Sequence, residues 1–148
     1  GLYRDRIGAC SIVAKSAVAA DIIGAVMVTV VRVNYSMPPA HGAALVETIL
    51  SSDELTAQWH VELKEMRDRI GDMRHLLVNK LAENGVTQDF SFITKQNGMF
   101  SFLGINGEQI DRLRDEFGIY VVGSSRISLA SISTDNVDYL TKSIAKIL

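Results

Sequence analysis

The strongest pattern in this sequence is a helical repeat of apolar residues in its middle third. Apolar side chains recur there at steps of three and four, as one face of an α-helix requires, at Leu55, Trp59, Leu63, Met66, Ile70, Met73, Leu77 and Leu81. Ser52-Asp53-Glu54 precedes the repeat with residues that start helices, and Asn84-Gly85 follows it, where a left-handed C-cap is expected. We therefore predict one long amphipathic helix between these two signals.

Short apolar segments alternate with turn residues downstream of the long helix. The pattern predicts strands over residues 90–93, 99–103, 119–122 and 126–130, and helices over residues 107–117 and from Ser133 or Thr134 to Leu148. This alternation indicates an α/β fold, in which the long helix stands in front of a small layer of sheet and helix.

Upstream of the long helix lie an apolar strand-like run and an apolar helix-like run. Residues 6–14 have the pattern of a buried strand, and Ser16 is placed to cap a helix over residues 17–31. The β-branched second half of the helical run would suit a strand equally well. Fifteen residues are fewer than the roughly 20 that a helix needs to span a bilayer, so we expect a buried helix and no membrane contact.

The composition argues against several classes of function. A net charge of −2 leaves no basic footprint for nucleic acid. The single cysteine, Cys10, cannot form an intramolecular disulfide, so nothing indicates secretion and we expect a cytoplasmic protein. His41, His60 and His75 are scattered, and no second cysteine lies at ligand spacing, so no metal site is predicted.

Three arginines stand in positions that could bind an anion. Arg126 follows a Gly-Ser-Ser turn at the start of an apolar strand, where a guanidinium needs either a bound carboxylate or a structural salt bridge to Asp or Glu. Arg32 ends the apolar helix, where the helix dipole alone favours a cation. Arg6 could bind a phosphate or simply be solvated. From these patterns alone, both alternatives stay open for each arginine.

Five segments, spread over nearly the whole chain, match segments of a known protein family in the same order and with similar gaps between them. They are residues 1–9 (GLYRDRIGA), 32–43 (RVNYSMPPAHGA), 96–102 (QNGMFSF), 116–120 (EFGIY) and 125–128 (SRIS). The most specific of them is the Tyr-Ser-x-Pro-Pro stretch that follows Arg32. In these segments the chain resembles the fold-type I aminotransferases that depend on pyridoxal 5'-phosphate, and in particular the aspartate/aromatic aminotransferase group.

The resemblance implies a role for individual side chains. Arg6 matches the arginine that grips the cofactor phosphate, and Ser36 lies where the family reaches the cofactor phosphate of the neighbouring subunit. Arg126 matches the arginine that binds the substrate α-carboxylate. Arg32 matches the one that reaches across the dimer to the distal carboxylate of aspartate or glutamate, and Phe100 lies where an aromatic ring lines the substrate pocket.

The resemblance also implies how the chain is organised. Residues 1–50 would belong to the large cofactor-binding domain, and residues 51–148 would supply the bridging helix and most of the C-terminal small domain. The parent enzyme would be a homodimer with shared active sites. The Schiff-base lysine is expected upstream of Gly1, so the chain by itself is expected to be inactive.

The parent enzyme would move an amino group between a dicarboxylic amino acid and a 2-oxo acid. An aromatic amino acid aminotransferase is the close alternative, since that subgroup can keep both substrate arginines. A non-catalytic α/β module that binds a small anion or a partner chain is an alternative from another class, and it fits the missing lysine.

Overall fold

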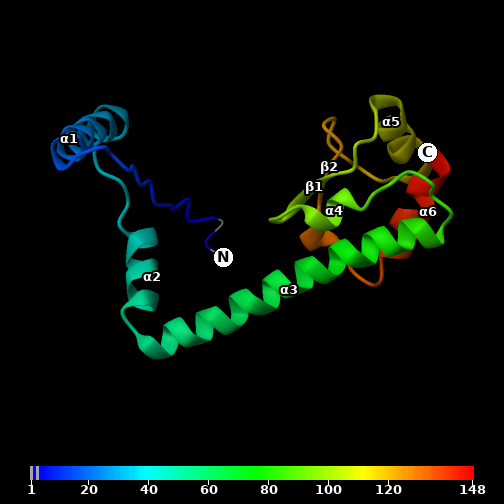
Figure 1. Ribbon diagram of the computed structural model, residues 1–148, viewed down its shortest axis with the longest axis horizontal. Coiled ribbons are helices and arrows are strands. Elements are labelled where there is room, and N and C mark those ends of the chain that lie inside the picture. Colours follow the sequence, from blue (N-terminus) through cyan, green and yellow to red (C-terminus); the bar gives the residue numbers. More distant parts are fainter. Residues whose placement is uncertain (1, 3) are drawn as a thin grey trace. The chain divides into compact units, whose positions relative to one another are not determined.

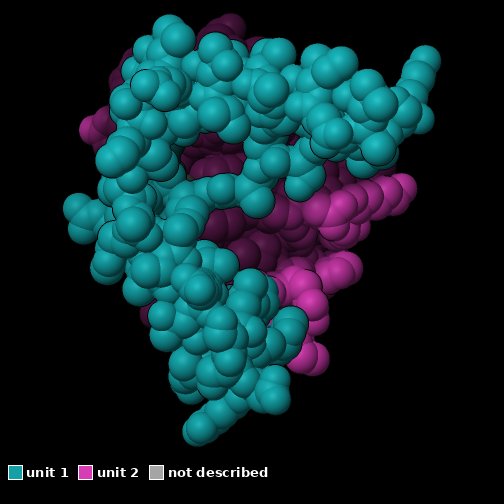
Figure 2. All heavy atoms as spheres, turned by 90° about the vertical axis from the view of Figure 1, so that its left-hand side faces the viewer, with its two compact units in different colours: residues 1–60 teal, residues 61–148 magenta. Residues whose placement is uncertain are grey.

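The computed structural model describes residue 2 and residues 4–148 and divides the chain into two compact units. The first unit covers residues 1–60 and the second covers residues 61–148, and Figure 2 colours them separately. Helix α3 (Asp53–Glu83) runs through the boundary, so its first turns belong to the first unit and the rest to the second.

Helix α1 (Ala17–Asn34) confirms the predicted helix and its cap. The backbone N–H of Ala19 donates to Ser16 Oγ at 3.2 Å, which satisfies one of the free donors of the first turn. Regular helical geometry therefore prevails over the strand alternative for the β-branched second half of this segment.

The prediction that this helix is buried is not met within the chain. None of the residues of α1 is buried, because no described layer of the first unit covers it. Of the helices in the described part of the chain, α1 alone is long and apolar enough to cross a membrane, with 18 residues and a mean hydropathy of 1.7. That is a weak indication, since an interior helix of a soluble protein has the same length and composition.

The strand predicted over residues 6–14 is wrong. This segment is an extended coil, drawn in dark blue in Figure 1, and Val13 within it is 99% exposed. A strand exists only when a neighbour satisfies its backbone donors and acceptors, and no described segment pairs with this one.

Helix α2 (His41–Leu50) lies against the coil at Ile7. A Cβ placed on Gly42 would approach Ile7 Cβ to 3.1 Å, so the absence of a side chain at Gly42 allows this contact. At the other end, Thr56 Oγ1 donates to the carbonyl of Ile49 at 2.8 Å and joins the end of α2 to the start of α3. The coil and both helix ends are thereby linked within the first unit.

Helix α3 begins and ends where its predicted signals stand. The N–H of Leu55 donates to Ser52 Oγ at 3.3 Å, and Gly85 adopts a φ of 78° just past the last turn. The apolar stripe is not buried along its whole length: among its residues only Leu77 and Leu81, near the C-terminal end, are buried.

The second unit packs short elements against the last turns of α3 (Figure 1). They are α4 (Phe92–Lys95), β1 (Phe100–Phe102), α5 (Gly107–Phe117), β2 (Arg126–Ser128), a 3-10 turn η1 (Leu129–Ser131) and α6 (Val137–Ile147). Their shared core consists of Leu77, Leu81, Phe90, Ile93, Leu103, Ile105, Ile110, Leu113, Leu129, Ile132, Val137, Ile144 and Ile147. The predicted α/β class is confirmed, with one two-stranded antiparallel sheet in the described residues.

Two of the predicted strands are wrong because local hydrogen bonds turn the backbone. At residues 90–93, Asp89 accepts from the Ser91 N–H at 2.7 Å and from its hydroxyl at 3.0 Å, and this starts the short helix α4. At residues 119–122, the N–H of Ile119 returns to the carbonyl of Leu113 at 2.9 Å and closes the end of α5.

The end of the chain begins its last helix later than predicted. Helix α6 starts at Val137, and neither Ser133 nor Thr134 caps it. Asn136 instead accepts from the Ser133 N–H at 2.9 Å and donates to the Ser131 carbonyl at 2.9 Å, which holds this segment in a turn before the helix. The strand predicted over residues 126–130 likewise ends at Ser128, where η1 begins.

Leu77→Ala is expected to lower the free energy of unfolding by about 2–5 kcal/mol, because it empties a fully covered core position. Leu63→Ala is the matched control, since it makes the same change on the same helix where the side chain is 38% exposed. It should lower the stability by less than about 0.5 kcal/mol. Urea unfolding measures both, and equal losses would contradict the packing of α3 described above.

Candidate functional site

The two-stranded ribbon of the second unit separates a buried face from an exposed face. In its register Phe100 pairs with Ser128, Ser101 with Ile127, and Phe102 with Arg126. Successive side chains of a strand point to opposite faces. Ser101 is therefore buried beneath the ribbon, while its neighbours on β1 are exposed on the outer face.

Arg126 and Phe100 meet on the exposed face of this ribbon. The guanidinium carbon Cζ of Arg126 lies 4.6 Å from the centroid of the Phe100 ring, within the range of a cation–π contact. The two residues are diagonal neighbours across the strands, a spacing that a long side chain can bridge. The structure thus brings together two of the predicted substrate-binding residues.

Arg126 has no carboxylate partner in the part of the chain that the structure describes. The structural salt bridge considered from the sequence is therefore not formed by any described Asp or Glu. Its guanidinium is exposed and rests only on an aromatic ring. All of its donors remain available to an anion from outside.

Other arginines of the second unit differ from Arg126 in this respect. Arg112 binds Glu116 at 2.7 Å, and this hydrogen bond lowers the pKa of the Glu116 carboxyl below its ordinary value. Arg114 binds Asp115 at 2.7 Å and Asp111 at 2.9 Å, so its pKa is raised by the two carboxylates. All three pairs lie on the exposed surface of α5, where such pairs stabilise a protein little.

The turn before Arg126 is held in a strained conformation. Ser125 is buried and has a φ of 60°, a left-handed conformation that side chains other than glycine rarely adopt. Its carbonyl accepts from the Leu103 N–H at 2.9 Å, and its hydroxyl accepts from the Gly104 N–H at 3.1 Å. These two bonds fix the backbone from which Arg126 projects.

Positive φ angles also mark both predicted phosphate-binding residues. Among the described residues other than glycine, only Arg6 (φ 50°), Ser36 (φ 60°) and Ser125 have them. Strained backbone of this kind concentrates at binding sites, where the surrounding structure holds it in place. The observation motivates a site role for Arg6 and Ser36 without identifying the ligand.

The remaining predicted residues all lie in the first unit. Arg32 stands in the last turn of α1, which is the position that the helix-dipole alternative requires, and its side chain is exposed. Ser36 follows that helix and is exposed, with its N–H bonded to the Val31 carbonyl at 3.1 Å. Arg6 is exposed and lines an open hollow of about 420 Å³ together with Leu2, Ile7 and Gly8.

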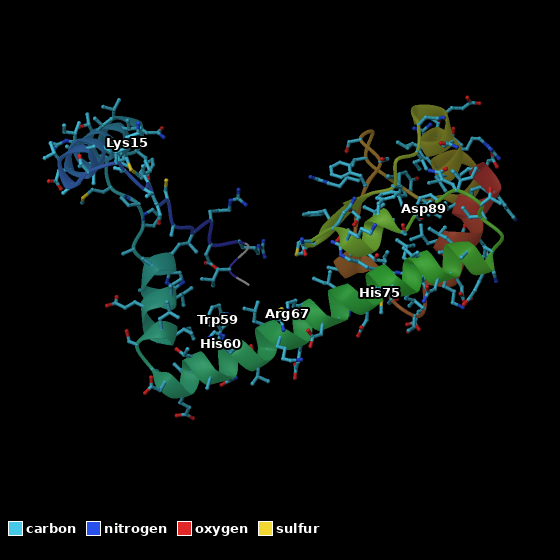
Figure 3. The ribbon with its side chains drawn as sticks, in the orientation of Figure 1. Lys15, Trp59, His60, Arg67, His75 and Asp89 are labelled. Atoms are coloured by element: carbon cyan, nitrogen blue, oxygen red, sulfur yellow. The ribbon has the colours of Figure 1, made fainter. Side chains whose placement is uncertain are left out.

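The first unit also contains a larger and mostly apolar cavity of about 620 Å³. It is lined by Leu2, Ile7, Gly8, Ala9, Leu45, Val46, Thr48, Ile49, Leu50 and Trp59. Figure 3 labels Trp59 and His60 on α3, where the centroids of their two rings lie 4.9 Å apart. None of the predicted site residues lines this cavity, although it shares Leu2, Ile7 and Gly8 with the hollow at Arg6.

Arg74 was not predicted as a functional residue, yet it is the one buried charged residue in the described part of the chain. It is 4% exposed and binds four acceptors beneath the ribbon. A signal for it exists in the sequence, because Ile70, Arg74, Leu77 and Leu81 are spaced as one face of a helix. A charged residue on such a stripe must be either exposed or fully hydrogen-bonded.

Comparison with known proteins establishes the class to which the chain belongs. Residues 1–144 match the model of the family described as aminotransferase class I and II. The chain therefore belongs to the class I and II aminotransferase family, as its five segments suggested.

Three relatives illustrate the similarity. Aspartate aminotransferase of Escherichia coli (strain K12) is 51% identical over all 148 residues, and its aromatic-amino-acid aminotransferase is 39% identical over 147. The crystal structure of aromatic-amino-acid aminotransferase from Burkholderia pseudomallei, covalently bound to pyridoxal phosphate, covers 99% of this chain with a TM-score of 0.91 and 48% identity. The chain spans about 37% of the length of each of these proteins.

The chain offers part of what a phosphate-bearing cofactor would need. Arg6 and Ser36 are exposed donors on strained backbone, which suits a phosphate. Three of the six lysines are already engaged, Lys64 and Lys80 by carboxylates and Lys146 by the ring of Phe117. The residues present therefore fit the phosphate end of such a group, while no lysine stands in the family's context.

Proposed function

We propose that this chain is the C-terminal portion of an aspartate aminotransferase, which moves an amino group between aspartate or glutamate and a 2-oxo acid with pyridoxal 5'-phosphate. One observation carries the proposal: Arg126 lies on Phe100 with no carboxylate partner, in a chain 51% identical to an aspartate aminotransferase. An unpaired and oriented guanidinium is what the capture of a substrate carboxylate requires.

Arg126 is proposed to bind the α-carboxylate, which every amino acid substrate carries. Its planar fork can hold both carboxylate oxygens, and the Phe100 ring keeps the guanidinium from turning away. Arg32 is proposed to bind the distal carboxylate across a dimer interface. Two guanidinium groups at opposite ends select a dicarboxylate by its length and charge.

Arg6 and Ser36 are proposed to hold cofactor phosphate, with Ser36 acting toward the neighbouring subunit. Pyridoxal phosphate would supply the electron sink of the reaction, and the protein would bind and orient the cofactor and the substrate. Residues 1–50 are proposed to belong to the large cofactor-binding domain. Residues 51–148 are proposed to form the bridging helix and the small domain.

A homodimer in the cytoplasm is the proposed assembly and location. The single cysteine suits a reducing compartment, and sharing of sites between subunits follows from the roles proposed for Arg32 and Ser36. In this assembly the exposed apolar surface of α1 is proposed to be covered by the remainder of the protein. No nucleic acid and no membrane takes part.

An aromatic preference is the second candidate. It is supported by the 48% identity with the Burkholderia pseudomallei aromatic-amino-acid aminotransferase, which is close to the 51% identity with the E. coli aspartate aminotransferase. The two candidates differ in whether Arg32 contributes to the binding of the preferred substrate.

The 148-residue chain alone is expected to show no transaminase activity. It should also form no stoichiometric adduct on a single lysine when it is mixed with pyridoxal phosphate and reduced with borohydride, because none of its lysines stands in the family's context. Absorbance of the reduced protein and peptide mapping measure the adduct. One fully labelled lysine would contradict this expectation.

A chimera tests the activity and the role of Arg32 together. Residues 1–148 would replace the matching 37% of the E. coli aspartate aminotransferase. In this chimera Arg32→Leu should lower kcat/KM for aspartate about 30-fold or more, because loss of one partner of a buried charge pair typically costs about 2–5 kcal/mol. Phenylalanine, which has no distal charge, should lose much less.

Arg126→Leu in the same chimera is the comparison, since it should impair aspartate and phenylalanine alike. An equal loss for both substrates in Arg32→Leu would leave Arg32 as a structural residue at a helix terminus. A folded chimera without transaminase activity would contradict the proposed function itself.

Shared active sites predict complementation between inactive subunits. Chimeras carrying Arg32→Ala or Arg126→Ala would be mixed, unfolded and refolded together. Random pairing should restore about a quarter of the parent activity, because half of the dimers are hybrids with one intact site of two. Activity no higher than that of the separate variants would count against sharing.

A further inference from the structure

The guanidinium of Arg74 lies beneath the same ribbon that carries Phe100 and Arg126. One of its nitrogens, Nη1, donates to the Ile93 carbonyl at 3.0 Å and to Ser101 Oγ. The other, Nη2, donates to the Gly98 carbonyl at 2.6 Å and to the Phe100 carbonyl at 3.2 Å. A single side chain of α3 thus binds α4, the turn at Gly98 and strand β1.

All four acceptors of Arg74 are neutral. No described carboxylate pairs with it, and burial without such a partner lowers the pKa of its guanidinium from the ordinary value. Burying a cation to hold a turn costs the free energy of its desolvation, and an apolar side chain in the same place would not have this cost. What an apolar residue cannot provide is a rigid planar fork that fixes several carbonyls at once.

The Phe100 carbonyl links this buried fork to the exposed arginine. Arg74 holds the backbone of Phe100 from below, and the ring of Phe100 supports the guanidinium of Arg126 at 4.6 Å on the outer face. Arg126 has no other described side-chain partner to orient it. Its direction therefore depends on the ring, and the position of the ring depends on the strand that Arg74 anchors.

We propose that Arg74 is a positioning residue for substrate binding, because it holds the Phe100 platform on which Arg126 meets the substrate carboxylate. The inference rests on the proposed function only for the identity of the ligand. The mechanical link from Arg74 through Phe100 to Arg126 is a property of the chain itself. A long side chain that is already oriented loses less conformational freedom when it binds.

The first experiment measures this link by NMR on the 148-residue chain. Ring current from Phe100 should shift the side-chain resonances of Arg126 upfield, and Phe100→Leu, which removes the ring, defines zero shift. In Arg74→Met the shift should fall to less than about half of its original size, because strand β1 loses its two hydrogen bonds to Arg74, at Phe100 and Ser101, and the turn before it loses the one at Gly98. Core methyl resonances of Leu77 and Ile144 report whether the unit is still folded.

Arg69→Met is the matched control. Arg69 stands on the same helix and donates to two backbone carbonyls, those of Ala130 at 3.2 Å and Ile132 at 2.9 Å, and neither of these hydrogen bonds reaches β1. It should leave the Arg126 shift unchanged. An unchanged shift in a folded Arg74→Met chain would overturn the proposal.

Arg74→Lys decides the question if Arg74→Met does not fold. It keeps a positive charge but lacks the planar fork, so the Arg126 shift should again be largely lost. Retention of the full shift in Arg74→Lys would overturn the proposal, because a point charge would then suffice.

The second experiment separates this inference from the proposed function. In the aminotransferase chimera, Arg74→Lys should raise KM for aspartate and for phenylalanine about tenfold alike, because both bind through the α-carboxylate, while Arg69→Met stays within about twofold. Loss of the NMR shift together with an unchanged KM would uphold the link to Arg126 and contradict the substrate role proposed for Arg126. A KM that rises for aspartate alone would overturn positioning through Arg126.

Discussion

The fold of the second unit depends on the packing of its short elements against the last turns of α3. Leu77 and Leu81 are almost fully covered there, and Arg74 on the same stripe binds the strand above them. A ribbon of two three-residue strands is marginal in water by itself. It becomes a firm platform because one helix supplies both an apolar floor and a hydrogen-bonded anchor.

The arginines of the second unit have different kinds of partner according to their solvent exposure. Arg112 and Arg114 pair with carboxylates on the surface, whereas Arg74 is buried and satisfied by neutral oxygens. Arg126 is the exception, because it is exposed, oriented by a ring and without a described carboxylate. A protein that binds carboxylates needs an arginine of this last kind, since internal partners would compete with the ligand.

The helices of the chain were largely predictable, while its strands were not. Periodicity and capping residues lie within a few positions of each other, so Ser16, Ser52 and Gly85 correctly marked the ends of long helices. The apolar runs at 90–93 and 119–122 carried the strand pattern, yet each folded into local turns. Whether a short apolar run becomes a strand depends on a partner elsewhere in the chain, which no local pattern reveals.

The sequence by itself determined the family and the bounds of the long helix α3, and it supplied the candidate residues Arg126, Phe100, Arg32, Arg6 and Ser36, because these follow from local order along the chain. Only the tertiary structure decided that Arg126 rests on Phe100 without a described carboxylate, and that Arg74 binds beneath the same strand. Those contacts join residues 26 positions apart in the chain. Their formation depends on how β1 packs on α3 and pairs with β2, which is a property of the folded core rather than of any one segment.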